Sequence, residues 1–115
     1  MPIDARYVFI ASMDVDADKE AIFNEVYDTE HIPYLLKVPG VRSAVRLKGE
    51  TFAVSIGGVN NPVAHKGPVY SAIFEVDSPD VLVSPQWAQA VEAGRWPKQV
   101  RPYTRNRHHA LFKVR

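Results

Sequence analysis

Four stretches of the chain gather β-branched and aromatic residues in the way that is typical of β-strands. They are residues 6–13, 41–47, 69–76 and 107–114. The apolar stretch at residues 51–57 is either a further strand or the start of a long excursion over residues 48–68. Because this excursion is rich in glycine, asparagine and proline, the pattern favours a loop there.

A helix is predicted from Ala17 onward, where apolar side chains recur every three or four residues. The acidic cluster before it offers Asp14, Asp16 or Asp18 as an N-cap. Pro33 has no amide hydrogen to donate, and its ring would clash with the preceding helical turn. We therefore expect the main helix to end near His31, with a bent turn through residues 32–37.

A second helical segment is predicted at residues 78–94, which opens with a serine and a proline and closes on Gly94. Pro85 divides this segment, so the regular helix is expected over residues 84–93. Residues 95–106 contain two prolines and are expected to form an extended linker before the last strand.

The order of these elements is strand, helix, strand, excursion, strand, helix, strand. This order predicts an α+β fold of the ferredoxin-like βαββαβ type, in which an antiparallel sheet carries both helices on one face. A length of 115 residues suits one such domain over residues 1–115. The strands are too apolar to leave the other face in water, so we expect a homodimer to cover it. The residues assigned to that face include Val8, Ile10, Val45, Ile73, Phe74, Leu111 and Phe112.

Composition narrows the classes of function. The chain has 14 basic and 13 acidic residues and no cysteine. A chain without cysteine has no disulfide, no thiolate metal site and no cysteine nucleophile. No apolar run approaches the roughly 18–20 residues that a membrane helix needs, and the first residues make a poor signal peptide. We therefore expect a cytoplasmic protein with no membrane partner.

Charge is distributed unevenly along the chain. Residues 1–36 hold eight acidic residues against two basic ones, and residues 93–115 hold seven basic residues and no acidic one. A basic tail can bind nucleic acid, or its charges can pair with the acidic first helix within one chain or between two. Prolines and aromatic residues interrupt the basic stretch, which favours ion pairing, and no nucleic-acid partner is expected.

The segment at residues 23–33, FNEVYDTEHIP, is followed by two leucines at residues 35–36 and by VPGV at residues 38–41. This pattern resembles the first-helix signature of EthD-like members of the dimeric α/β-barrel superfamily. The sequence SPQW at residues 84–87 and the later Gly94, Arg101, Pro102 and Asn106 are similar to that group as well. The resemblance covers residues 6–48 and 69–115.

The resemblance implies a homodimer whose two sheets form a barrel, with a small-molecule pocket between each sheet and its helices. It leaves the reaction open, because relatives include monooxygenases, isomerases and cyclases. It implies either a cofactor-free enzyme of oxygenase, isomerase or cyclase type, acting on a small aromatic or polyketide-like molecule, or a non-catalytic binding or assembly module.

His31 is the first candidate for catalysis, because an imidazole titrates near neutral pH and can act as a general acid or base. Asp28 precedes it by three residues, which on a helix places both on one face, where Asp28 can orient the imidazole. Tyr27 and Tyr34 can hydrogen-bond a phenol or carbonyl of the substrate. The alternative is a structural pair of His31 and Asp28 that fixes the helix end.

Five arginines are candidates for holding a carboxylate or enolate oxygen, and we favour Arg101 and Arg46 among them for substrate binding. The full set is Arg42, Arg46, Arg101, Arg105 and Arg107. The competing interpretation is that these arginines form ion pairs with the acidic residues of the first helix across a dimer. For the set as a whole, we favour ion pairing over substrate binding.

No cofactor or metal is expected. The acidic run at residues 14–18 has the spacing of a calcium loop, but Lys19 stands where that loop requires glycine. His108 and His109 are adjacent on a strand and point to opposite faces, so they cannot chelate one metal together. The glycine-rich phosphate motifs and the metalloprotease histidine motif are absent from the sequence.

Overall fold

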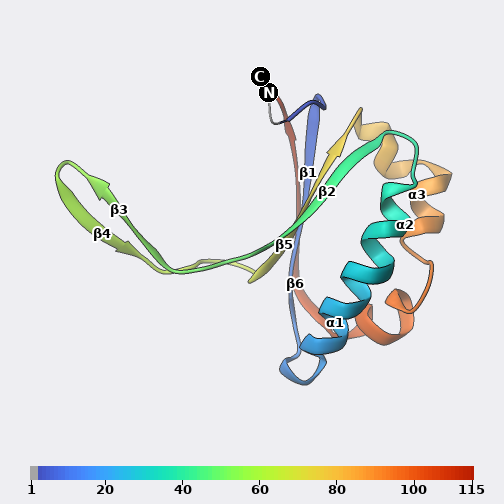
Figure 1. Cartoon of the computed structure of the whole chain (residues 1–115), viewed down its shortest axis with the longest axis horizontal. Coiled ribbons are helices and arrows are strands. Elements are labelled where there is room, and N and C mark those ends of the chain that lie inside the picture. The colour runs from blue at the N-terminus through green and yellow to red at the C-terminus, as the bar shows by residue number, and fades with distance from the viewer. Residues whose placement is uncertain (1–2) are drawn as a thin grey trace.

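A four-stranded antiparallel sheet forms the body of the protein in the computed structural model, which describes residues 3–115 (Figure 1). Its strands are β1 (Tyr7–Val15), β2 (Val41–Lys48), β5 (Tyr70–Val76) and β6 (Thr104–Lys113), in the spatial order β2-β5-β1-β6. The helices lie together on one face of this sheet. The predicted α+β, ferredoxin-like fold is therefore confirmed, and each of the four predicted strands is present within a few residues of its expected bounds.

The first helical segment begins with one 3-10 turn (Ala17–Lys19) and continues as α1 (Glu20–Val26), a turn of π-helix (Tyr27–His31) and α2 (Ile32–Leu36). The predicted end near His31 is therefore wrong. In the π turn the Ile32 amide donates to the Tyr27 carbonyl, five residues back. We infer that this wider turn gives the Pro33 ring the room that a regular α-helix would deny it.

The expected aspartate cap is also absent, because Asp16 occupies the N-cap position without a side-chain cap hydrogen bond. Its carboxylate pairs with Arg105 instead, at 3.0 Å. At the other end of the segment, Arg95 forms ion pairs with Glu25 and Glu30. The expected pairing of the basic C-terminal region with the acidic first helix is thus confirmed within one chain.

The second helical region begins with a 3-10 segment (Pro79–Val83) and continues as α3 (Pro85–Ala90). The Ser84 hydroxyl accepts a hydrogen bond from the Trp87 amide at 3.2 Å and so caps α3, whereas Ser78, the serine that opens the predicted segment, makes no side-chain cap hydrogen bond. The expected extended linker at residues 95–106 is wrong, because this stretch contains a π turn (Trp96–Val100) and a 3-10 turn (Arg101–Tyr103) before β6. Trp96 and Val100 are the buried residues of that π turn.

Residues 48–68 also differ from the expected loop. They contain the hairpin of β3 (Phe52–Ile56) and β4 (Val59–Val63), which we call the arm and which projects away from the body (Figure 1). Gly57 and Gly58 have φ angles of 60° and 81°, the conformation that a tight two-residue hairpin turn requires. The glycines that suggested a loop therefore serve to join two strands.

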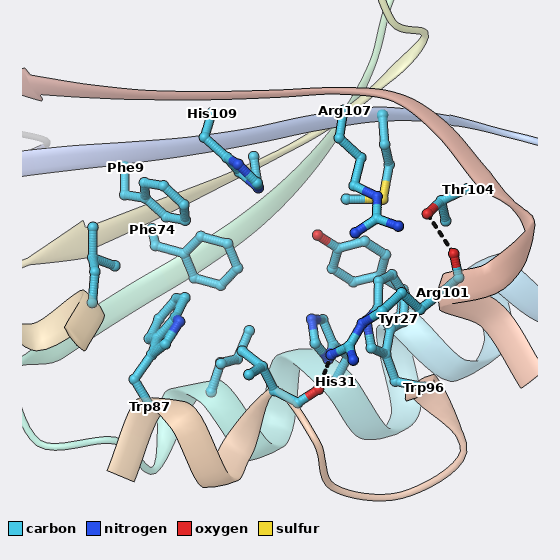
Figure 2. A pocket seen from close by; sticks show the side chains of 15 residues that line it. Phe9, Tyr27, His31, Phe74, Trp87, Trp96, Arg101, Thr104, Arg107 and His109 are labelled. Atoms are coloured by element: carbon cyan, nitrogen blue, oxygen red, sulfur yellow. Dashed lines mark hydrogen bonds between the residues drawn. The ribbon is translucent and has the colours of Figure 1, made fainter. Parts of the chain in front are cut away.

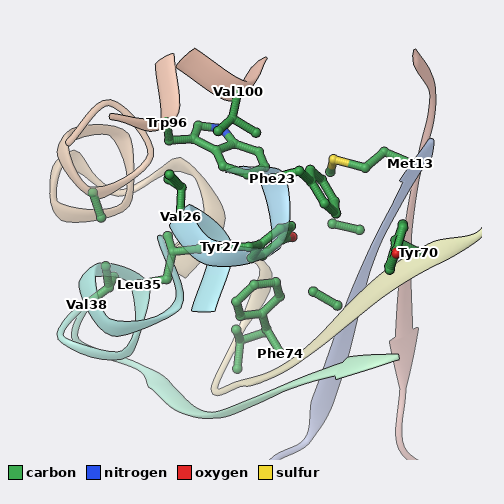
Figure 3. Close-up of a cluster of buried hydrophobic side chains, with 14 of the residues drawn as sticks. Met13, Phe23, Val26, Tyr27, Leu35, Val38, Tyr70, Phe74, Trp96 and Val100 are labelled. Atoms are coloured by element: carbon green, nitrogen blue, oxygen red, sulfur yellow. The ribbon is translucent and has the colours of Figure 1, made fainter. Parts of the chain in front are cut away.

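The core lies between the sheet and the helices (Figure 3). Its largest fully buried side chains are Phe23, Phe74, Leu35, Val26, Val76 and Val100. Phe74 and Leu111 were expected on the uncovered face, but both pair with Phe9 and share its side of the sheet. Val45, Leu47 and Phe112 do lie on the face away from the helices, where they are exposed.

Within residues 3–115, no helix is long and apolar enough to cross a membrane.

Replacing Phe23 with alanine is expected to lower the free energy of unfolding by about 3–5 kcal/mol, because Phe23 is fully buried and packs against Tyr27, Tyr70 and Trp96. Urea denaturation followed by circular dichroism measures this change. Val83→Ala is the control, because Val83 is 83% exposed and its truncation should change the value by less than about 0.5 kcal/mol. A Phe23 variant as stable as the native protein would contradict the core described above.

Candidate functional site

A cavity of about 340 Å³ lies between the sheet and the helices (Figure 2). Strands β1, β5 and β6 form its roof, and the first helical segment, α3 and the Trp96–Val100 turn form its floor. The alternation of side chains along a strand explains which residues line it. Phe9, Ala11 and Met13 of β1 lie on this side, together with Arg107 and His109 of β6.

One end of the cavity is apolar and aromatic. Phe9, Phe74 and Trp87 meet there, with the Trp87 ring edge-on to both phenylalanines at centroid distances of 5.8 Å and 5.7 Å. The His109 ring stacks on Phe9 at 5.6 Å. Edge-on and stacked contacts of this kind leave flat ring surfaces on which another planar group can lie.

The other end is polar and depends on the π turn of the first helical segment. Tyr27 and His31, which begin and end that turn, lie with ring centroids 5.1 Å apart. Trp96 stacks on the His31 ring at 4.0 Å with an interplanar angle of 13° and meets the Tyr27 ring edge-on at 4.8 Å. The imidazole is therefore held in place by two aromatic neighbours.

His31 is 6% exposed, and its Nδ1 atom is buried with no hydrogen-bond partner among the described residues. Burial, and to a smaller extent the positive charge of Arg101, lower the pKa of His31 from 6.5 to about 4, while Glu92 acts in the opposite direction. The imidazole is consequently neutral at neutral pH, with one nitrogen able to accept a proton and the other carrying one.

Asp28 does not orient His31, contrary to the expectation from their spacing. Its carboxylate binds Arg46 at 2.9 Å. A π turn holds more residues per turn than an α-helix, so side chains three apart diverge while those four apart come into line. This geometry separates Asp28 from His31 and brings Tyr27 and His31 together.

Tyr27 presents its hydroxyl to the cavity (Figure 2). Burial raises the pKa of Tyr27 to about 12, although the nearby Arg46 charge acts in the opposite direction. The phenol therefore stays protonated at neutral pH and can donate a hydrogen bond to a ligand oxygen.

Two predicted substrate-binding residues lie outside this cavity. The Arg46 guanidinium packs over the Tyr27 ring, 4.4 Å from its centroid, and donates to Asn24 at 2.9 Å. Tyr34 lines a separate depression beside Lys37. The structure thus brings Tyr27 and His31 together in the cavity, while Arg46 contacts Tyr27 from outside the cavity and Tyr34 lies elsewhere.

The third predicted substrate-binding residue, Arg101, does line the cavity. Its guanidinium donates to the Glu92 carboxylate at 2.9 Å and to the Val91 carbonyl at 2.7 Å. A carboxylate of the chain therefore already balances its charge.

No group of three or more histidine, aspartate or glutamate side chains able to hold a metal ion occurs in the part of the chain that the structure describes.

The sequence and the structure were compared with those of known proteins. No protein-family model matches the sequence, and no curated protein is significantly similar to it. An ethyl tert-butyl ether (EthD) family protein from Bacillus halodurans has a similar structure, with a TM-score of 0.60, 12% identity, and coverage of 95% of this chain and 99% of that one. The chain has an EthD-like fold.

Two structures of MhuD are also similar. One holds two manganese protoporphyrin IX molecules per active site, with a TM-score of 0.59, 13% identity, and coverage of 94% of this chain and 93% of that one. The other is the heme-degrader from Mycobacterium tuberculosis with two hemes in its active site, with a TM-score of 0.54, 12% identity and 94% coverage of each chain. At such low sequence identity these structural similarities establish the fold alone. They confirm the resemblance to EthD-like proteins at the level of the fold.

Sequence reasoning missed the aromatic frame of the site in this EthD-like fold. Trp96 belongs to the hydrophobic core and Trp87 packs against it, and both also line the cavity, a role that the sequence pattern did not indicate. Arg107 was one of five candidate arginines, with nothing in the sequence to separate it from the others. The pairing of β6 with β1 decides its position, and that pairing is long-range information.

The pKa of His31 predicts a specific pH dependence. Between about pH 6.5 and pH 4 the unfolded chain binds a proton at this position that the folded chain does not, so the free energy of unfolding falls as pH falls. The difference between 6.5 and about 4 corresponds to about 3 kcal/mol. His31→Phe keeps a ring against Trp96 and removes the titration, so its unfolding free energy should fall by about 3 kcal/mol less over this range.

Urea denaturation at several pH values measures the difference between the native protein and the variant. Val83→Ala is the control, because Val83 is 83% exposed and carries no titratable group, so its replacement should leave the pH profile parallel to the native one. A His31 variant whose profile also runs parallel would show that the imidazole is not buried in its neutral form.

Proposed function

We propose that the cavity binds a small aromatic molecule and that His31 exchanges a proton with it. The observation that supports this proposal best is the combination of an aromatic-lined space of about 340 Å³ with a buried, unpaired imidazole at one end. Ligand sites commonly combine apolar walls with a few polar groups that fix orientation. Because His31 lines the cavity, its imidazole is positioned to form a hydrogen bond with a ligand.

The volume of the cavity supports a ligand of one or two rings. An apolar cavity of about 150 Å³ is large enough to hold benzene. The cavity here is roughly twice that size, which does not fit the four pyrrole rings of the porphyrins bound in the MhuD structures. The porphyrins of those structures are therefore too large for this cavity.

The chemistry that these groups support is proton removal without a cofactor. In the proposed first step, a neutral His31 nitrogen takes a proton from an acidic O–H or C–H of the ligand, and the electron pair of that bond stays on the ligand as a phenolate or enolate. The Tyr27 hydroxyl donates a hydrogen bond to the resulting oxyanion. A cofactor-free isomerase, cyclase or oxygenase can begin with this step.

The low pKa of His31 in the empty cavity makes it a weak base. A negative charge formed on the ligand beside it would favour the protonated imidazole and so assist the transfer. Asp28 contributes nothing to this step, because it is bound to Arg46. Stacking against Trp96 takes over the orienting role that the sequence had suggested for Asp28.

A non-catalytic binding or assembly module is the second candidate. The stacking of His31 against Trp96 and Tyr27 supports it, because those contacts give His31 a packing role whether or not it transfers protons.

We further propose that a second copy of the chain covers the open face of the sheet. Val45 and Phe112 on that face are 52% and 57% exposed. The arm, which continues from β2, exposes Phe52, Ile56 and Val59 as well. An apolar surface of this extent is typical of a face that meets a partner, and self-association covers it without a second gene product.

Binding can be followed through tryptophan fluorescence, because both tryptophans of the chain line the cavity. Phenol, catechol and 4-hydroxybenzamide are expected to change the emission saturably. His31→Phe should weaken the binding of phenol by roughly tenfold, because it removes the acceptor for the phenol hydrogen. His65→Phe should bind like the native protein. Unchanged phenol binding by His31→Phe would contradict the assignment of His31.

Proton transfer is tested separately, by deuterium incorporation at the ring carbons of resorcinol in heavy water, measured by NMR. The native protein should accelerate incorporation and His31→Phe should not. Saturable binding without acceleration by the native protein would favour the non-catalytic module.

The homodimer is tested by Val45→Glu, measured by analytical ultracentrifugation. A charge on the open face should convert a dimer of the native chain into a monomer, because a buried, unpaired carboxylate opposes association. Val83→Glu is the matched control, since Val83 is 83% exposed and lies outside that face. A native protein that sediments as a monomer would contradict the proposal.

A further inference from the structure

The cavity is lined by two arginines that differ in how their charge is balanced. Arg101 is held by the Glu92 carboxylate and the Val91 carbonyl. Arg107, on β6, forms no ion pair with any carboxylate in residues 3–115. Figure 2 shows its side chain descending from β6 into the cavity, above Tyr27. Its guanidinium is therefore a free cationic group inside the proposed ligand site.

We propose that the ligand is an aromatic carboxylate and that Arg107 binds its carboxylate group. This inference rests on the proposed function and narrows the ligand class. A planar guanidinium matches a carboxylate because two parallel N–H groups can donate to its two oxygens.

The charge balance of the cavity supports an anionic ligand. None of the residues that line it is an aspartate or a glutamate, and Arg101 takes its counter-charge from Glu92 outside the lining. The two arginines also act on the neighbouring imidazoles. Burial is the largest cause of the lowered pKa of His109 and of His31, and the second cause is the charge of Arg107 for His109 and of Arg101 for His31. An anion entering the cavity would meet a positive potential with no competing carboxylate in the walls.

The positions of the two ends explain why the anion should be attached to an aromatic ring. The flat surfaces of Phe9, Phe74 and Trp87 form one end, and Arg107 and Tyr27 stand toward the other (Figure 2). A ring lying on the aromatic surfaces can direct a carboxylate toward Arg107, with the Tyr27 hydroxyl as a further donor. His31, which also lines the cavity, can accept a hydrogen bond from a hydroxyl substituent of the same ring.

The neighbouring Arg105 provides a matched control on the same strand. It lies outside the cavity lining and pairs with Asp16 at 3.0 Å. Arg107→Gln and Arg105→Gln remove the same charge from the same strand, so any difference between them reports on position rather than on net charge. Both residues are accessible to solvent and neither belongs to the hydrophobic core, so neither substitution disturbs the core.

The experiment compares 4-hydroxybenzoate with 4-hydroxybenzamide, which have nearly the same shape and differ in charge. Titration calorimetry and tryptophan fluorescence on the full chain give the two dissociation constants. The native protein and Arg105→Gln should bind the acid at least about tenfold more tightly than the amide. Arg107→Gln should lose this preference by weakening the acid alone. Thermal unfolding confirms that each variant is folded.

Equal binding of the two probes by the native protein, or a preference for the acid that survives in Arg107→Gln, would overturn the carboxylate inference. Saturable binding of the amide in those cases leaves the proposed aromatic site standing. If neither these probes nor phenol and catechol bind at all, both the inference and the proposed function fail.

Discussion

The stacking of Trp96 on His31 is the contact on which the site depends. It joins two π turns, Tyr27–His31 and Trp96–Val100, which come from opposite ends of the chain. The same tryptophan also meets Tyr27 and Phe23, so one side chain links the cavity floor to the core. The ion pairs of Arg95 with Glu25 and Glu30, one residue earlier, hold the two segments together at the surface. His31 and Trp96 pack against each other and both line the cavity, so this contact forms part of the cavity floor.

The parts of the fold that the sequence predicted are those set by local rules. Strand β5 alternates buried and partly exposed residues along its whole length, which is the period that identifies a strand. Ser84 caps α3 because a serine before a proline satisfies the first amides of a helix. The wide turns at Tyr27–His31 and Trp96–Val100 were missed, since what stabilises them is burial of Tyr27, His31 and Trp96 against one another. The arm was missed because its glycines and asparagines also suit an open loop.

The site shows the same division between local and long-range information. His31 was identified because it stands within a recognisable segment, but its partner was wrong because the spacing rule assumed an α-helix. Arg107 and Trp96 reach the cavity through strand pairing and chain reversal, which a linear pattern does not contain. Arg46, expected to bind substrate, instead lies between the rings of Tyr27 and Tyr70 and stabilises the far side of the helix.

The π turn also fixes the phase of the helix on either side of it. It holds one residue more than an α-helical turn within nearly the same rotation, so α2 continues in phase with α1. Leu35 of α2 is 1% exposed and lines the cavity beside His31. Deletion of a single residue between Tyr27 and His31 would let the turn close to an α-helical one and leave Leu35 in the core, but it would reduce the spacing of Tyr27 and His31 from four residues to three. The extra residue of the turn therefore serves the cavity and not the helix that follows it.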